Sequence, residues 1–256
     1  MPRPIDWDAI HAEQVAYYRA RAPEYDQWWN RQGDYDLGEE FNRVWRAEVA
    51  GLDAALERFA PAGQVLEVAA GTGIWTHRLS RYSTEITALD TAPEALAINR
   101  SRLAGSNPPV RYIEADVFSW QPDRRFDVVS FAFWLTHVPP PRFDRFWSLV
   151  QDALRPDGRV FFVDNAPPRP ELPVLGRRFA CDGHQVEGIH SRTDLDLGVS
   201  VRRVHDGRRF QTIKVYWSPE DLQQRLRDLG WRAQVESTDW AFIYGHGTRA
   251  SSGTGA

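Results

Sequence analysis

Short apolar runs alternate with helix-like periods along the middle of the chain. The strand-like runs, rich in β-branched residues, cover residues 64–69, 85–90, 110–115, 126–132 and 159–164. The stretches with helical spacing between them cover residues 74–82, 142–154 and a segment that Thr91 caps and Pro93 opens. Strands that alternate with helices in this way predict an α/β fold, a parallel sheet with helices on both faces.

The two ends of the pattern extend this prediction. Ser218 begins a capping box, and a helix with one apolar face follows it until Gly230. Segments 232–237 and 240–246 then close the sheet as a terminal strand pair. At the other end, helical patterns over 8–22 and 39–59 precede the first strand.

Two regions lie outside the alternation. Residues 1–60 predict a helical lid over the carboxyl ends of the strands, where α/β sheets bind ligands. Residues 166–217 form an inserted cap that ends in a β-hairpin around His-Asp-Gly. We expect a single domain over 1–248 and a disordered tail over 249–256.

A small-residue turn ends the first strand. Glu67 lies within that strand, the turn runs from Ala69 to Gly73, and a helix begins at Ile74. A turn without bulky side chains lets a ligand reach backbone amides at a helix N-terminus. Asp90 ends the next strand, the usual place for a carboxylate that holds ribose hydroxyls. The pattern therefore predicts a nucleoside-containing cofactor.

The composition limits the classes of partner that the chain is expected to bind. The 256 residues carry a net charge of −4, so no overall basic field attracts nucleic acid or an anionic membrane. No apolar run reaches the length of a membrane span, and the single cysteine, Cys181, indicates a reducing, cytoplasmic location. Monomer and homodimer both stay open, and no metal is expected. Lys214 is the one lysine among 31 basic Lys and Arg residues.

The glycine turn and the positions after it resemble the class I S-adenosylmethionine-dependent methyltransferases over roughly residues 18–165. Their first motif, acidic-x-Gly-x-Gly-x-Gly, corresponds to Glu67 through Gly73, with Ala69 in place of the first glycine and a negative φ expected there. A dinucleotide fold would instead need a third glycine where Thr76 stands. The resemblance thus implies a Rossmann-like, seven-stranded, mostly parallel sheet that binds S-adenosyl-L-methionine.

The resemblance also implies a role for single residues. Asp90 would hold the ribose, the residues around Asp116 would frame the adenine, and the stretch from Phe131 to His137 would meet the methionine end. Tyr18 and Tyr25 match an entrance motif over the cofactor. The expected cofactor residues are Tyr25, Glu67, Ala69, Gly71, Gly73, Asp90, Thr91, Ala115, Asp116, Val117 and Phe131.

The methyl acceptor is predicted to be a small molecule. The Asn/Asp-Pro-Pro-Tyr signature of DNA and protein amide methylases is absent after the fourth strand, and the net charge is negative. His137 occupies that region as a candidate general base, a cationic anchor or a helix cap.

The hairpin adds cations. Lys214 lies among apolar residues, and the hairpin register decides which arginine shares its face of the hairpin. A two-residue turn places Arg203 on the Lys214 face. A three-residue loop with Gly207 left-handed places Arg202 there. We favour the second, because Asp followed by Gly suits a type I turn with a bulge. Lys214, Arg202 and His137 then form a clamp for an anionic head group.

This clamp is similar to that of phosphonate O-methyltransferases of antibiotic pathways, which implies O-methylation of a phosphonate, phosphate or carboxylate. The candidate substrate residues are Tyr18, Tyr25, His137, Arg202 and Lys214. One alternative is a neutral phenol or amine acceptor with His137 as base and the tryptophans as platform. Another is a cofactor-binding scaffold without turnover.

Overall fold

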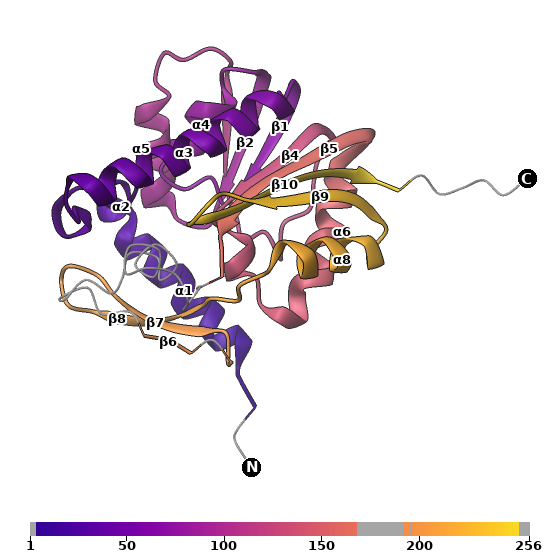
Figure 1. Ribbon diagram of the computed structural model, residues 1–256. Helices are drawn as coiled ribbons and strands as arrows, with labels where there is room; N and C mark the ends of the chain where they lie inside the picture. The colour runs from indigo at the N-terminus through magenta and orange to yellow at the C-terminus, as the bar shows by residue number, and fades with distance from the viewer. Residues whose placement is uncertain (1–3, 168–191, 195, 251–256) are drawn as a thin grey trace, which may run out of the picture.

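A seven-stranded sheet runs through the computed structural model, which describes residues 4–167, 192–194 and 196–250 (Figure 1). The strand order is β3-β2-β1-β4-β5-β10-β9, in which β10 alone is antiparallel to its neighbours β5 and β9. The strands are β1 (Gly63–Val68), β2 (Ser83–Asp90), β3 (Val110–Glu114), β4 (Phe126–Ala132), β5 (Leu154–Asn165), β9 (Trp231–Ser237) and β10 (Phe242–Arg249). The predicted Rossmann-like, mostly parallel sheet is confirmed.

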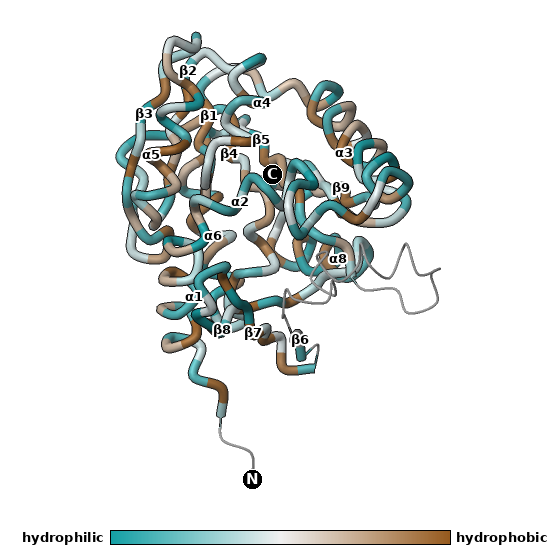
Figure 2. The backbone as a smooth tube through the Cα atoms, turned by 90° about the vertical axis from the view of Figure 1, so that its left-hand side faces the viewer, coloured by the Kyte–Doolittle hydropathy of each residue, from teal (hydrophilic) through white to brown (hydrophobic). Residues whose placement is uncertain are grey.

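Helices cover both faces of this sheet. They are α3 (Glu39–Phe59), α4 (Ile74–Leu79), α5 (Pro93–Arg102), α6 (Phe143–Ala153) and α8 (Pro219–Asp228). Successive strand residues point to opposite faces, so Val128 packs with α3 and α4, and Val129 packs with α6 and α8. Each face therefore has its own apolar core. Figure 2 shows hydrophobic (brown) and hydrophilic (teal) positions alternating along α3.

Element boundaries differ from the predicted ones at a few places. Helix α4 ends at Leu79 instead of residue 82, which lets β2 begin at Ser83. Strand β5 begins at Leu154 instead of residue 159, with a register shift where Phe126 pairs with Leu154 and Val128 pairs with Arg159. The Ser218 cap is confirmed, because its hydroxyl accepts the Asp221 amide at 3.0 Å.

The N-terminal helices lie against a separate, three-stranded sheet. Helices α1 (Trp7–Arg21) and α2 (Tyr25–Asn30) flank the 3-10 turn η1 (Ala22–Glu24), and the small sheet consists of β6 (Arg192–Asp194), β7 (Val199–Arg203) and β8 (Arg209–Ile213). Both views place α1 beside β8 (Figures 1 and 2). Gln14 joins them, because its side-chain oxygen accepts the Ile213 amide at 3.0 Å.

Helix α1 also contacts the segments that follow β2, β3 and β4. Arg19 pairs with Glu94, and Gln14 donates to the carbonyl of His137. This places α1 over the carboxyl ends of the parallel strands, where a ligand site is expected. The division into a lid (1–60) and a cap (166–217) within one domain stays a prediction.

Part of the predicted cap and most of the predicted tail cannot be compared. Residues 168–191 and 195 of the cap, including Cys181, and residues 251–256 of the tail lie outside the described residues. Residue Arg249, assigned to the tail, is the last residue of β10. Among residues 4–167, 192–194 and 196–250, none of the helices combines the length and apolar character that a membrane span requires.

Candidate active site

The turn after β1 has an unusual backbone. Ala69, Gly71 and Gly73 have φ of +53°, +53° and +88°, all in the left-handed region. The negative φ expected at Ala69 is therefore wrong, because the turn needs a left-handed residue at this position as well. A non-glycine residue in that conformation costs on the order of 1 kcal/mol, which the surrounding structure has to offset.

A cavity of about 710 Å³ lies over this turn and is called the cofactor cavity. Its volume is in the range that binds cofactor-sized molecules. The lining residues are Tyr18, Ala22, Tyr25, Val68, Ala69, Gly71, Thr72, Leu89, Asp90, Thr91, Ala92, Ala95, Ala115, Val117, Ala132, Phe133, Trp134 and His137. Seven of the expected cofactor residues thus meet here: Tyr25, Ala69, Gly71, Asp90, Thr91, Ala115 and Val117.

The other four expected cofactor residues are placed differently. Gly73 backs the turn, where an added Cβ would lie 2.6 Å from Asn99. Phe131 is 1% exposed and stacks on Phe162 in the core, so Ala132 and Phe133 line the cavity in its stead. Strand alternation explains the shift, because adjacent residues of β4 face opposite sides. Glu67 and Asp116 lie behind the cavity wall.

Asp90 organises the rim of the cofactor cavity. One carboxylate oxygen accepts the Gly71 amide and the other accepts the Ala92 amide, both at 2.8 Å. The predicted cap at Thr91 is wrong: Ala92 is the N-cap of α5 without a side-chain capping bond, and the Asp90 carboxylate accepts the amide of Ala92 itself. Burial raises the pKa of Asp90, and these amide hydrogen bonds oppose the rise.

Glu67 lies beneath the turn, where it lines a small neighbouring cavity with Tyr25 and Phe133. Its side chain is 2% exposed, and burial raises its pKa to about 8, although a hydrogen bond with Thr76 lowers it. Its Oε2 atom is buried without a hydrogen-bond partner. A buried acceptor in this state suits a donor or cation supplied by a ligand.

Asp116 holds the lid helix. Its side chain is turned toward α1, where one oxygen lies 3.2 Å from His11 Nε2 and the other accepts the Phe118 amide. Partial burial raises the pKa of Asp116, but His11 and the Phe118 amide hold it below its ordinary value. The neighbours Ala115 and Val117 face the cofactor cavity.

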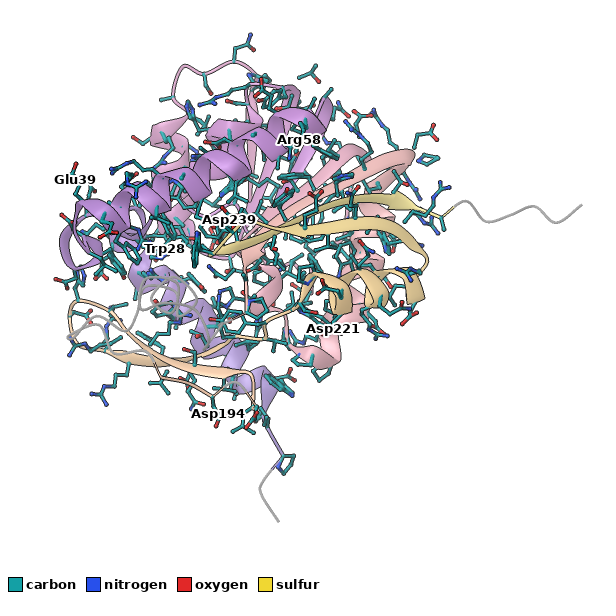
Figure 3. The ribbon with its side chains drawn as sticks, viewed as in Figure 1. Trp28, Glu39, Arg58, Asp194, Asp221 and Asp239 are labelled. Atoms are coloured by element: carbon teal, nitrogen blue, oxygen red, sulfur yellow. The ribbon has the colours of Figure 1, made fainter. Side chains whose placement is uncertain are left out.

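A second cavity of about 250 Å³ adjoins the first and is called the basic pocket. Its lining residues are Tyr18, Arg21, Tyr25, Trp28, Phe133, His137, Asn165, Arg202 and Lys214. Four of these, Tyr18, Tyr25, Phe133 and His137, also line the cofactor cavity, so the two cavities share a wall. All five residues expected to bind substrate line the basic pocket. Trp28, labelled in Figure 3, lies on α2 and meets Phe133 edge-on at 5.2 Å between centroids.

The hairpin register brings Arg202 into the basic pocket. The Val204 amide bonds to the Arg208 carbonyl across a three-residue loop, and Gly207 has φ +92°. Arg202 then pairs with Phe210 on the face that Lys214 continues, and both basic side chains are buried, at 3% and 1% exposure. The predicted three-residue loop is confirmed, and Arg203 lies outside the pocket lining.

His137 has a defined tautomer. It lies in the 3-10 turn η3 (Leu135–His137), and its Nδ1 is 2.6 Å from the Ile213 carbonyl. A carbonyl only accepts, so Nδ1 carries the proton and donates. Nε2 lies 2.8 Å from the Tyr18 hydroxyl. In the neutral imidazole Nε2 is then the acceptor, and the Tyr18 hydroxyl, whose pKa burial raises well above its ordinary value, donates to it.

Four residues of the basic pocket were not among the five expected substrate residues: Arg21, Trp28, Phe133 and Asn165. Arg21 follows Tyr18 by three residues and so shares its helix face, a signal that the sequence already contains. Its guanidinium donates to the Tyr17 hydroxyl at 2.8 Å. Asn165 ends β5, at the carboxyl edge of the sheet where ligand residues gather. Phe133 has φ +56°, which no sequence pattern indicates.

Comparisons with known proteins agree with this geometry. A family model described as a methyltransferase domain matches residues 65–158. A ubiquinone biosynthesis O-methyltransferase of Pseudomonas fluorescens Pf-5 is 31% identical over 177 residues, which cover 66% of this chain and 70% of the relative. Another, from Cronobacter sakazakii, is 28% identical over 158 residues, and the chain spans only 60% of its length.

Solved structures match over nearly the whole chain. A structure described as a DhpI-SAM-HEP complex is 34% identical, covers 93% of this chain and 97% of its own, and has a TM-score of 0.69. A DhpI-SAH complex is 32% identical, covers 95% and 98% of the two chains, and has a TM-score of 0.70. The similarity therefore includes the lid helices and the hairpin as well as the central sheet.

Proposed function

The chain belongs to the class I S-adenosylmethionine-dependent methyltransferases, and from this premise we propose that it methylates an oxygen atom of a small anionic metabolite. The acceptor class is a phosphonate, phosphate or carboxylate. The observation that carries the proposal is the basic pocket, where Arg21, Arg202 and Lys214 meet next to the cofactor cavity.

The cofactor cavity suits S-adenosylmethionine in each of its parts. The glycine turn and Asp90 fit the ribose, and the apolar wall of Leu89, Ala115 and Val117 fits the flat adenine ring. The buried Oε2 of Glu67, without a hydrogen-bond partner, fits the ammonium group of the methionine end. When bound, S-adenosylmethionine supplies a methyl group on a positively charged sulfur, which becomes a neutral thioether once that methyl has moved.

The charge of the basic pocket selects the acceptor. Its lining carries three formal positive charges, and no acidic side chain belongs to that lining in the part of the chain that the structure describes. Burying cations away from water is costly unless counter-charge is near, so an anionic ligand is strongly favoured. Two planar guanidinium groups and one ammonium suit the several oxygens of one oxyanion.

An anionic acceptor simplifies the chemistry. Its oxygen already carries the lone pair that attacks the methyl carbon, so no residue has to remove a proton. The protein mainly holds the oxygen in line with the breaking bond and excludes water. Tyr18, Tyr25 and Phe133 lie where the cavities meet and are placed to do both. Cations also weaken an oxygen nucleophile, so we expect slow turnover.

The relatives support a small acceptor bound beside the cofactor. The DhpI structure that is similar over nearly the whole chain contains SAM together with a second ligand, HEP. The curated relatives are named as O-methyltransferases. The names of the curated relatives favour transfer to oxygen, and the basic pocket adds the anionic class.

One observation favours a second candidate function. In the neutral imidazole, Nε2 of His137 is an acceptor in the shared wall, which suits a general base for a neutral alcohol or phenol. Three neighbouring cations argue against a neutral acceptor, so we place this alternative second.

Methyl transfer from radiolabelled S-adenosylmethionine to a panel of phosphonates, carboxylates and phenols tests the proposal. We expect turnover with an anionic acceptor, and Lys214→Met should raise its KM about ten-fold or more while S-adenosylhomocysteine affinity stays nearly constant. Arg203→Met is the matched control, because this hairpin arginine does not line the pocket. Turnover of phenols alone, or equal loss of acceptor and cofactor binding in Lys214→Met, contradicts the proposal.

A further inference from the structure

The ammonium group of Lys214 has two side-chain acceptors. Its Nζ donates to Asn165 Oδ1 at 2.6 Å and to Thr136 Oγ1 at 3.2 Å, and it lies 5.1 Å from the centre of the Tyr216 ring. Lys214 is only 1% exposed. A lysine this deeply buried keeps its charge only if its surroundings offset the loss of water.

Asp164 holds both acceptors in place. It lies in β5 with an exposure of 0%. Its Oδ1 accepts the Thr136 hydroxyl at 2.8 Å and the Asn165 amide at 2.7 Å, and its Oδ2 accepts the Thr136 amide at 2.9 Å. One carboxylate thus fixes the backbone and hydroxyl of Thr136 and the backbone of Asn165, the two residues to which Lys214 donates.

The direction of these hydrogen bonds indicates an ionised carboxylate. Thr136 Oγ1 accepts from Lys214, so its own proton is directed to Asp164. The other two contacts of Asp164 are amide donors, which also require an acceptor. Burial raises the pKa of Asp164, and the charge of Lys214 and these three donors oppose that rise.

The described lining of the basic pocket around Lys214 contains further cations and no carboxylate. Arg21 faces the pocket from α1 and Arg202 faces it from β7, while the other titratable lining residues are His137, Tyr18 and Tyr25. The two guanidinium groups disfavour a third cation beside them. Asp164 is a buried carboxylate whose contacts and charge reach Lys214.

We propose that Asp164 is a positioning residue of the basic pocket: through Thr136 and Asn165 it keeps Lys214 charged and directed toward the bound anion. The inference rests on the proposed function in taking the bound anion to be the methyl acceptor. The link between Asp164 and Lys214 is testable without any acceptor. Asp164 does not line the pocket, and it acts through its two neighbours and through its buried charge.

The single lysine of this chain makes the first test direct. Protein labelled with [13C,15N]-lysine gives the signals of one lysine side chain, that of Lys214. We expect these signals to report a charged ammonium from pH 6 to 9 in the parent. In Asp164→Asn the lysine should titrate at least about one pH unit lower, because a buried negative charge is gone. Asp127→Asn, a half-buried carboxylate at the start of β4, is the matched control and should titrate as the parent does.

The second test connects this charge to the anion. Calorimetry with methylphosphonate on protein saturated with S-adenosylhomocysteine should show affinity about ten-fold weaker in Asp164→Asn at one pH unit above the lysine pKa measured in that variant. The loss should shrink one unit below that pKa, where Lys214 regains its proton, and cofactor affinity should stay constant. In Asp164→Asn/Lys214→Arg this pH dependence should disappear, because a guanidinium stays charged.

The outcomes separate the two proposals. Unchanged lysine titration in Asp164→Asn overturns the role of Asp164, even if Lys214→Met weakens methylphosphonate binding. A second outcome is that Lys214 titrates at lower pH in Asp164→Asn while Lys214→Met keeps full affinity for methylphosphonate. That result overturns the proposal of an anionic acceptor, and with it the purpose assigned to Asp164. If Asp164→Asn does not fold, Thr136→Val removes the hydroxyl link at similar volume and should shift the lysine titration in the same direction; no shift there also overturns the inference.

Discussion

The Tyr18 hydroxyl lies 2.8 Å from Nε2 of His137, in the wall shared by the cofactor cavity and the basic pocket. Because Nδ1 of His137 donates to the Ile213 carbonyl, the hydroxyl is the donor of this pair. Tyr18 of the lid helix α1 thereby holds the imidazole ring of His137, which follows β4. Residues far apart in the sequence thus share the boundary across which the methyl group passes.

Tyr18→Phe removes this hydrogen bond and leaves Nε2 of His137 without its donor. A buried acceptor left in this state costs about 1–3 kcal/mol, so we expect kcat/KM to fall roughly ten- to hundred-fold. The phenyl ring still covers the cofactor cavity, so S-adenosylhomocysteine affinity should fall much less. Steady-state kinetics with calorimetry in parallel measures both; a loss confined to cofactor binding would contradict the role given to this pair.

The pH–rate profile distinguishes an anion ligand from a general base at His137. With an anionic acceptor, we expect the acid limb to follow the ionisation of the acceptor itself. A fluorinated phosphonate, which ionises at lower pH than methylphosphonate, should therefore move that limb to lower pH. His137→Gln should keep the limb and lower the rate; its disappearance in this variant would indicate that His137 acts as base.

Gly71 and Gly73 should respond differently to alanine. An added Cβ at Gly71 meets its nearest atom at 4.0 Å, whereas at Gly73 it meets Asn99 at 2.6 Å. We expect Gly71→Ala to cost about 1 kcal/mol of stability for its positive φ and to lose most cofactor affinity, because Gly71 lines the cavity. Gly73→Ala adds a steric clash and should cost about 2 kcal/mol or more. Thermal unfolding with and without S-adenosylhomocysteine separates the two effects.

The sequence was sufficient for the sheet because alternation and turn residues are local signals. The run Phe126–Ala132 and the Ser218 cap show this, since each depends on a few adjacent residues. The hairpin register was also readable, because Asp-Gly in a three-residue loop decides which arginine faces Lys214. Cofactor residues at strand ends followed from the order of the strands.

Contacts between distant segments could not be read in the same way. Asp164 and Asn165 end a strand, but their hydrogen bonds to Thr136 and Lys214 depend on how η3 and the hairpin pack. The positive φ of Ala69 and Phe133 is imposed by tertiary structure against the preference of the residue. The lid contact between His11 and Asp116 likewise joins segments that no sequence period relates.

Glu67 should make the ligand-free protein less stable as the pH rises. Its pKa is raised from 4.5 to about 8, chiefly by burial, so the folded state keeps a proton that the unfolded state has released. Stability is therefore fully present below pH 4.5 and is lost across the window up to about pH 8. At 1.36 kcal/mol per pH unit, the loss is on the order of 5 kcal/mol.

The Glu67→Gln variant should lose this dependence of stability on pH, so a comparison with the parent measures the contribution of Glu67. Urea unfolding between pH 5 and 8 should show the variant becoming progressively more stable than the parent, because the amide has no proton to lose.

Binding should respond in the opposite direction: if Glu67 meets the ammonium of the cofactor, affinity for S-adenosylhomocysteine rises with pH in the parent and stays flat in the variant. Calorimetry in buffers of different ionisation enthalpy then detects a proton released from the parent alone. Parallel unfolding curves for the two proteins across this range would mean that the pKa of Glu67 is not raised and that its carboxylate is already ionised in the ligand-free fold, which would contradict the expected loss of stability.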